Sequence, residues 1–363
     1  MVNKIKKRFM FEITDLKMAG AQYMLCDLLS EFVMFENDII VVVLGENPKN
    51  ELSMKMEKLG VKIQYMSKKS NNFFVRKIQT YIFLSKCIKS YKPDIIHANL
   101  DYVYIWIYAL IHRHFFYETI HTQPYRIYNN RLCFFYKLLY RNRLIRPILL
   151  TDSGRDEFCQ LFKTRETDVE VIANPVKVDR FSNEPILKNK EDSVKFVSVA
   201  RFHKIKNHRL LINAFRKTCS KIKNCELYLA GDGELYDDIK KYTLDLGIMD
   251  KVIFLGEVED IPGLLAKSDV MVISSDSESF SLVLVEAMAA GLPVIATSVG
   301  GMRDIVRENG VLVKPNDVEG MANAMIGLAE NPMLRYEYGM KSKKLVKEYS
   351  LENIVEKYKR VLC

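Results

Sequence analysis

The stretch from residue 270 to 303 constrains the fold most, because it encodes a strand, a helix and a second strand in direct succession. Apolar residues 270–273 predict a strand, a polar turn follows, and an apolar helix runs from about 281 to 290. Gly291 ends that helix, and residues 294–297 predict the second strand. A crossover of this kind joins neighbouring strands of a parallel sheet.

Two carboxylates lie eight residues apart in this crossover, Glu278 in the turn and Glu286 inside the helix. The first helix amides, those of Ser281, Leu282 and Val283, lack intrahelical partners and carry partial positive charge, so we expect them to bind a phosphate. Glu286 lies in an otherwise apolar helix, where it needs a ligand, a cation or a solvent-facing position. The alternative is that both are ordinary solvated surface carboxylates.

The same stretch resembles the signature of the large family of retaining GT-B glycosyltransferases that use nucleotide-sugar donors, the family 4 type. The residues that carry the resemblance are Glu278, Glu286, Gly291, Pro293, Gly300 and Gly301. The resemblance implies that Glu286 binds the ribose hydroxyls and that Glu278 lies near the transferred sugar. Ser279 and Ser281 stand where the family has glycine, and their hydroxyls can shape the sugar pocket, so the donor does not follow from the resemblance.

The resemblance implies an α/β GT-B fold with two Rossmann-like, doubly wound parallel-sheet domains and a deep cleft between them. The 363 residues suit two cores, and strands alternate with helices in both halves. Residues 174–181 resemble the family's linker motif. We therefore expect an acceptor-binding domain over 1–173, a nucleotide-sugar domain over 174–348, and a last helix over 349–363 that crosses back to the first domain.

Two cations follow the first strand of the expected second domain, Arg201 and Lys206. A strand end that opens onto a helix can place both on one diphosphate, Arg as a fork and Lys as a point charge. The resemblance assigns them to the departing nucleoside diphosphate and places the backbone around Val258 beside the nucleobase. The alternative is that both cations are ordinary surface residues.

Three residues of the first half lie at positions where such a sheet binds ligands: Gly20, His97 and His121. Gly20 opens a helix after the first strand, where a glycine lets the backbone approach the donor phosphates closely. His97 and His121 lie at strand ends, where open α/β sheets bind ligands. By resemblance, His121 contacts the donor sugar or the acceptor, and we expect His97 to be structural. His112 and His114 flank an arginine, and we expect them to be solvated.

The net charge of +9 lies almost wholly in the first half, where residues 1–173 hold 26 Lys and Arg against 18 Asp and Glu. Residues 58–93 hold nine basic residues and no acidic one, and residues 124–147 mix basic and aromatic side chains, again without an acid. Such a surface is attracted to anionic lipid. A generic solvated basic surface is the alternative, and no module that recognises nucleic acid is visible.

The seven cysteines are scattered and show no C-x-x-C spacing, which favours a reduced cytoplasm. Early acidic residues argue against a signal peptide, and the apolar run 102–111 is about half the ~20 residues that cross a bilayer. We therefore expect a cytoplasmic protein that can bind the inner face of the plasma membrane.

By resemblance, the chain is a metal-independent retaining glycosyltransferase with no cofactor. We expect it to move a sugar from a nucleotide sugar to a lipid-linked glycan acceptor in bacterial surface polysaccharide synthesis. A UDP-sugar is the favoured donor. Asp276 and Glu278 are the nearest approach to a metal-binding Asp-x-Asp pair, and we expect no metal there. Two alternatives stay open: a nucleotide-sugar epimerase of the same fold, and a non-catalytic binding protein.

Overall fold

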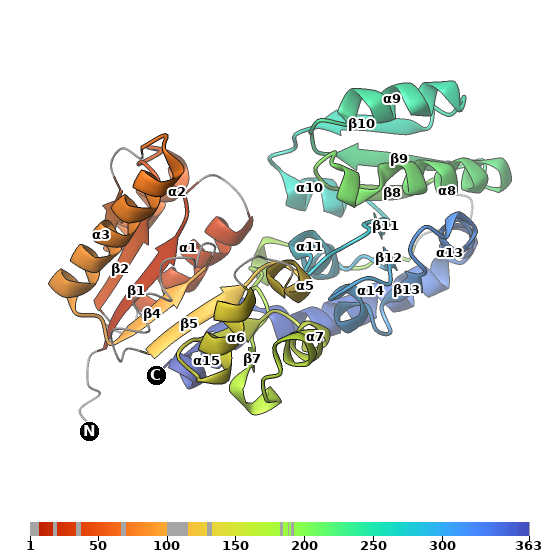
Figure 1. Cartoon of the computed structure of the whole chain (residues 1–363). Helices are drawn as coiled ribbons and strands as arrows, with labels where there is room; N and C mark the ends of the chain where they lie inside the picture. The colour runs from red at the N-terminus through yellow and green to blue at the C-terminus, as the bar shows by residue number, and fades with distance from the viewer. Residues whose placement is uncertain are drawn as a thin grey trace. The chain divides into compact units, whose positions relative to one another are not determined.

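A computed structural model describes residues 7–16, 20–33, 38–66, 70–99, 115–128, 133–181, 184–187, 189 and 192–362 of the chain. The chain forms two compact units, one from residues 1–175 and 351–363 and the other from residues 176–350 (Figure 1). The boundaries expected from the sequence lie at residues 174 and 349. Because the last helix belongs to the first unit, the chain enters and leaves the second unit once.

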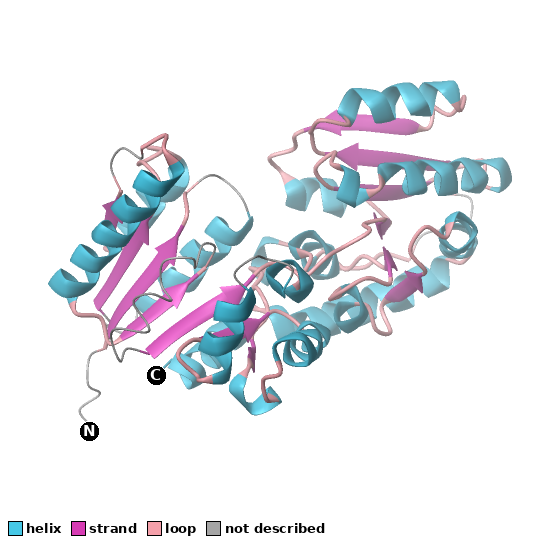
Figure 2. Cartoon of the chain, in the orientation of Figure 1, coloured by secondary structure: helices cyan, strands magenta, loops and turns pink. Residues whose placement is uncertain are grey.

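The first unit is built on a seven-stranded parallel sheet of order β3-β2-β1-β4-β5-β6-β7. Figure 2 shows the strands in magenta and the helices in cyan. Its strands are β1 (Arg8–Ile13), β2 (Asp38–Val43), β3 (Lys62–Tyr65), β4 (Ile95–Ala98), β5 (Phe115–Ile120), β6 (Arg146–Leu149) and β7 (Glu170–Val171). Strand β1 pairs with β2 on one side and β4 on the other, so Phe11 lies between Val41 and His97. The strand order reverses direction between β1 and β4, which is where open α/β sheets bind ligands.

Helices cover both faces of this sheet. They are α1 (Gly20–Val33), α2 (Glu51–Lys58), α3 (Phe73–Tyr91), α5 (Pro124–Tyr128), α6 (Cys133–Arg141), α7 (Asp152–Phe162) and α15 (Leu351–Leu362). One apolar cluster joins α3, α6 and α7 to the sheet through residues such as Leu84, Tyr140 and Phe158. On α15, Tyr358 is fully buried and lies near Thr119 of β5, so the last helix is part of this core.

The second unit is built on a six-stranded parallel sheet of order β10-β9-β8-β11-β12-β13. Its strands are β8 (Val194–Val199), β9 (Cys225–Ala230), β10 (Val252–Gly256), β11 (Val270–Ile273), β12 (Val294–Thr297) and β13 (Gly310–Val313). Its helices are α8 (His208–Lys221), α9 (Tyr236–Asp245), α10 (Ile261–Ala266), α11 (Leu282–Ala289), α12 (Met302–Ile305), α13 (Val318–Glu330) and α14 (Pro332–Leu345). Here the order reverses between β8 and β11, so the loops after these two strands meet.

The predicted fold class is confirmed, because both units are doubly wound parallel α/β sheets. Strands β11 and β12 have the bounds that their apolar runs predict. None of the described helices combines the length and the apolar composition that a bilayer span requires. The apolar run 102–111, His112 and His114 lie outside the described residues.

Candidate active site

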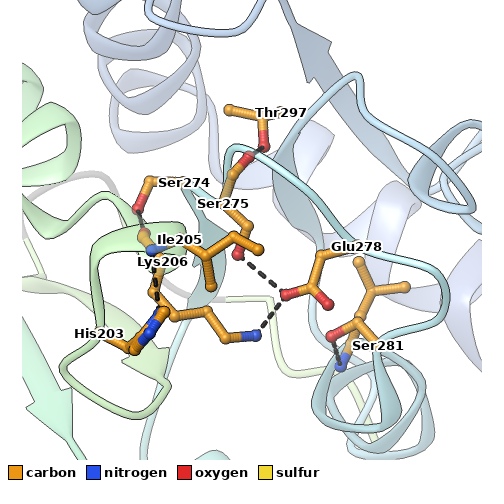
Figure 3. Close-up of polar contacts among 9 residues, drawn as sticks. His203, Ile205, Lys206, Ser274, Ser275, Glu278, Ser281 and Thr297 are labelled. Carbon is orange, nitrogen blue, oxygen red and sulfur yellow. Dashed lines mark hydrogen bonds and ion pairs between the residues drawn. The ribbon is translucent and has the colours of Figure 1, made fainter. Parts of the chain in front are cut away.

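Lys206 and Glu278 form an ion pair at the point where the strand order of the second unit reverses (Figure 3). Lys206 ends a short 3₁₀ turn after β8, and Glu278 lies in the loop between β11 and α11. The side chains are 27% and 12% exposed, respectively. Ser275 donates a hydrogen bond of 2.9 Å to the Glu278 oxygen that faces Lys206. The carboxylate is thereby held by a cation and a hydroxyl from two different loops.

Three further hydrogen bonds join the two loops. The Ser274 hydroxyl donates to the Lys206 carbonyl at 2.8 Å, and the Asp276 amide donates to the Ile205 carbonyl at 2.8 Å. The Asn207 amide group donates to the Asp276 carboxylate at 2.7 Å. Because these bonds bracket Lys206 on both sides, the position of its ammonium group is set by the β11 loop as well as by its own loop.

Helix α11 begins directly after this pair. Ser281 is its N-cap, and the Ser281 hydroxyl accepts a hydrogen bond from the Leu284 amide at 3.4 Å (Figure 3). Ser281 is 5% exposed, and its hydroxyl caps the helix. The amides of Leu282 and Val283 precede the first intrahelical bond and carry the positive end of the helix dipole.

Glu286 lies on the accessible side of α11. Leu282, Val283 and Glu286 are the half-buried positions of this helix, while its other residues are buried. Positions three and four apart share one helix face, so Glu286 lies below the free amides of the first turn. Burial raises the pKa of Glu286, and the positive charge of Arg180 opposes that shift. The first-turn amides of α11 and the Glu286 carboxylate, one turn further along, therefore lie on the same face of the helix.

Arg201 lies in the same loop as Lys206 but has a different partner. Its guanidinium is 3.7 Å from the Glu234 carboxylate, and its side chain is 69% exposed. The imidazole of His203 also approaches Glu234, at 3.5 Å. The loop fits only because Gly231 follows β9 with a φ of +130°, since an added Cβ would lie 2.2 Å from the Ala200 carbonyl. The glycine turn after β9 thus supports the Arg201 loop.

Val258 follows β10 and is half-buried. It lines a surface pocket of about 360 Å³ together with Tyr228 and Leu255. The role of its backbone beside a nucleobase stays a prediction.

The remaining predicted residues belong to the first unit. Gly20 is the first residue of α1, and the loop residues 17–19 before it lie outside the described residues. His121 directly follows β5, and burial lowers its pKa to about 4, so its imidazole is neutral. His97 is buried in β4 and bonds Thr119 at 2.7 Å through its Nε2, and burial lowers its pKa to about 3. These contacts fit the structural role expected for His97.

Sequence reasoning missed Ser274 and Ser275, whose hydroxyls hold Lys206 and Glu278. Their signal was a polar run directly after an apolar strand, where parallel sheets place functional groups. Among the described residues, no cluster of three or more His, Cys, Asp or Glu side chains is arranged to hold a metal ion.

Comparison with known families matches each half of the chain. Residues 179–345 match the family described as Glycosyl transferases group 1, and residues 18–180 match that described as Glycosyltransferase Family 4. The chain is 34% identical over 168 residues to the N-acetyl-alpha-D-glucosaminyl L-malate synthase of Bacillus anthracis, covering 46% of this chain and 44% of that protein.

A second relative is the UDP-Gal:alpha-D-GlcNAc-diphosphoundecaprenol alpha-1,3-galactosyltransferase of Escherichia coli, 29% identical over 204 residues and covering 53% of each chain. The chain spans about half the length of these curated relatives. The solved structure of Anabaena HepE in complex with UDP-glucose has the same fold, with a TM-score of 0.81, 20% identity, and coverage of 98% of this chain and 99% of that one. The two matches together span residues 18–345, and each is to a glycosyltransferase family.

Proposed function

We propose that this chain transfers a sugar from a UDP-sugar to a hydroxyl group of a glycan acceptor, with retention of configuration at the anomeric carbon. The observation that carries the proposal is the grouping of the Lys206 and Glu278 pair, the α11 amides and Glu286 at the reversal point of the second sheet. A cation and bare amides suit a diphosphate, and a carboxylate suits vicinal ribose hydroxyls.

Each group has a proposed part in the reaction. The bond between the anomeric carbon and the β-phosphate oxygen breaks, and negative charge grows on the diphosphate. Lys206, Arg201 and the amides of Leu282 and Val283 stabilise that charge, which lowers the barrier. The acceptor oxygen attacks from the side of the departing phosphate, and the phosphate takes the acceptor's proton. By resemblance alone, His121 is assigned to the donor sugar or the acceptor, and the backbone at Gly20 to the donor phosphates.

The identities of donor and acceptor rest on the relatives. The Escherichia coli relative is named for a UDP-galactose donor and a diphosphoundecaprenol-linked acceptor, and the Anabaena structure holds UDP-glucose. A relative from Rhizobium meliloti, 32% identical over 205 residues that cover 54% of this chain and 58% of that protein, is named as a lipopolysaccharide core glycosyltransferase. We therefore place the reaction in bacterial surface polysaccharide synthesis, with a lipid-linked glycan as the acceptor.

A panel of nucleotide sugars, incubated with and without a lipid extract of bacterial membranes, tests the proposal. We expect UDP release from one UDP-sugar, dependent on the extract, and a product whose anomeric configuration by NMR equals that of the donor. Conversion of the donor to an epimer without UDP release would instead identify an epimerase. Tight UDP binding with no turnover of any donor would identify a binding protein.

A further inference from the structure

Two cysteines of the second unit face each other across the connection between α8 and β9. Cys219 lies in the last turn of α8, Cys225 is the first residue of β9, and their Sγ atoms are 3.9 Å apart. The two sulfurs of a disulfide are about 2.05 Å apart, so this pair needs to close by about 2 Å. Rotation about the Cα–Cβ bond of either cysteine moves its sulfur through a comparable distance. The two thiols therefore lie where a disulfide can form.

The packing of α8 on β9 keeps the two cysteines opposite each other. Phe215 of α8 and Leu227 of β9 belong to one buried cluster, and Cys219 packs against that cluster. Cys225 is itself a member of the cluster, is 2% exposed, and donates to the Ile222 carbonyl at 3.3 Å. Because this core fixes both backbones, the sulfurs meet in the folded chain before any bond joins them.

The surroundings of the pair favour a reactive thiolate, which is the nucleophilic form of cysteine. Cys219 is half-buried and Lys223 in the connecting turn is exposed, so a small molecule can reach the pair. The hydrogen bond with Cys219 lowers the pKa of the Cys225 thiol; burial opposes that shift, and the charge of Lys251 supports it. Lys251 is held at the turn, because its ammonium donates to the Lys223 carbonyl at 2.7 Å. By contrast, burial raises the pKa of Cys87 in the first unit to about 11.

We propose that Cys219 and Cys225 form a reversible disulfide by exchange with a small disulfide such as oxidised glutathione. The sulfur of one cysteine attacks the small disulfide, whose sulfur–sulfur bond breaks, and one small thiol leaves with the proton of that cysteine. The sulfur of the other cysteine attacks the resulting mixed disulfide, and the second small thiol leaves with the second proton. Two cysteine thiols are thereby oxidised to one disulfide, and one small disulfide is reduced to two thiols. In a reducing compartment the pair stays a dithiol, and it closes when small disulfides accumulate.

The bond joins the end of α8 to the start of β9. A disulfide restricts the unfolded chain and so raises the free energy of unfolding, which makes the oxidised second unit the more stable form. Lys206 lies just before the first residue of α8, whereas Cys219 lies about 16 Å along the helix from that residue. The proposal does not depend on the transfer reaction, because the pair lies outside the candidate active site.

Peptide mass spectrometry tests the proposal with the full chain. The folded protein is equilibrated with reduced or with oxidised glutathione, quenched with acid, unfolded, alkylated at its remaining thiols and digested with trypsin. Trypsin cleaves after Lys221 and Lys223, between the two cysteines. The disulfide is therefore detected as peptide 218–221 linked to peptide 224–240. The thermal unfolding midpoint of each form is measured alongside.

Three variants complete the design. Cys219→Ser and Cys225→Ala each remove one member of the pair. Cys159→Ser is the matched control, because Cys159 is also a half-buried cysteine but lies in α7 of the first unit. Since oxidation of the folded wild type is measured directly, a variant that fails to fold leaves the test intact.

We expect at least about tenfold more linked peptide in oxidised than in reduced wild type, and dithiothreitol should remove it. Oxidation should also raise the unfolding midpoint of the wild type. Cys159→Ser should behave as the wild type does, whereas Cys219→Ser should lose both the linked peptide and the rise in midpoint.

Four results would overturn the proposal. Cys219 and Cys225 could be alkylated separately after oxidation, or either could end as a stable glutathione adduct. The linked peptides could come from two chains, which a dimer on a non-reducing gel would show. An unfolding midpoint that oxidation leaves unchanged would contradict the stabilising bond between α8 and β9.

Discussion

Lys206 and Glu278 are 72 positions apart in the chain, yet they form an ion pair between the loops after β8 and β11. The topology brings them together, because β8 and β11 are neighbours in the sheet and the chain leaves them in opposite directions. The pair keeps a cation beside the start of α11 before any donor binds. A diphosphate at this place would share the Lys206 ammonium with the Glu278 carboxylate.

Replacing Lys206 by alanine should lower the turnover of the donor at least tenfold, which corresponds to ~1.4 kcal/mol or more in the activation barrier. The reason is that the departing diphosphate loses its point charge. Steady-state UDP release checks this. The matched control is Lys204→Ala. Lys204 is an exposed lysine of the same 3₁₀ turn, and it is not the lysine that pairs with Glu278. Near-normal turnover of Lys206→Ala would remove its assigned role.

Replacing Glu286 by alanine should lower kcat/KM for the donor at least tenfold, because the ribose hydroxyls lose the carboxylate that accepts their hydrogen bonds. Two measurements separate a loss of binding from a loss of stability. Titration calorimetry should show a lower affinity for UDP, and the thermal unfolding midpoint should equal that of the wild type. Glu308→Ala is the control, because its side chain is 80% exposed. If UDP binds both variants equally well, Glu286 does not hold the ribose.

Much of the fold follows from the sequence because short β-branched runs bounded by glycine or polar residues define the strands, as in β8 and β11. The start of α11 at Ser281 was predictable for the same local reason. Helix α14 begins at Pro332 with Asn331 as its cap, and a 3₁₀ turn follows its end at Leu345. The signal was present, since a proline favours the first turn of a helix and asparagine its cap.

The contacts of the candidate site were less predictable than its residue types. Lys206 and Glu278 each follow from a motif, but their pairing depends on the order of strands in the sheet, which no local pattern encodes. Arg201 illustrates the limit, because its ion pair with Glu234 comes from the loop after β9. Side chains that meet through tertiary structure have no fixed spacing in the chain.

Replacing Gly231 by alanine should destabilise the second unit and lower donor turnover together. The backbone strain of its φ of +130° costs about 1–3 kcal/mol, and the added Cβ also meets the Ala200 carbonyl. Thermal unfolding and UDP release measure the two effects. Gly247→Ala is the control, because Gly247 also has a positive φ but open space around it. An equal loss of stability in both variants would show that the loop contact contributes nothing.

The first unit should lose stability as the pH rises from about 4.5 to about 8, because burial raises the pKa of Glu118 to about 8. Within this window the unfolded chain ionises at Glu118 and the folded chain does not, which costs about 1.4 kcal/mol per pH unit. Glu118→Gln, which keeps an acceptor for the Tyr140 hydroxyl at 2.9 Å, should remove this slope. Unfolding midpoints across the pH range check it, and an identical pH dependence in variant and wild type would contradict the assignment.

A crystal structure of the protein with bound UDP tests the central claim most directly. We predict that the diphosphate lies within hydrogen-bond distance of the Lys206 ammonium and of the Val283 amide, with the ribose hydroxyls on the Glu286 carboxylate. UDP bound elsewhere on the second unit, with these three groups left uncontacted, would contradict the account.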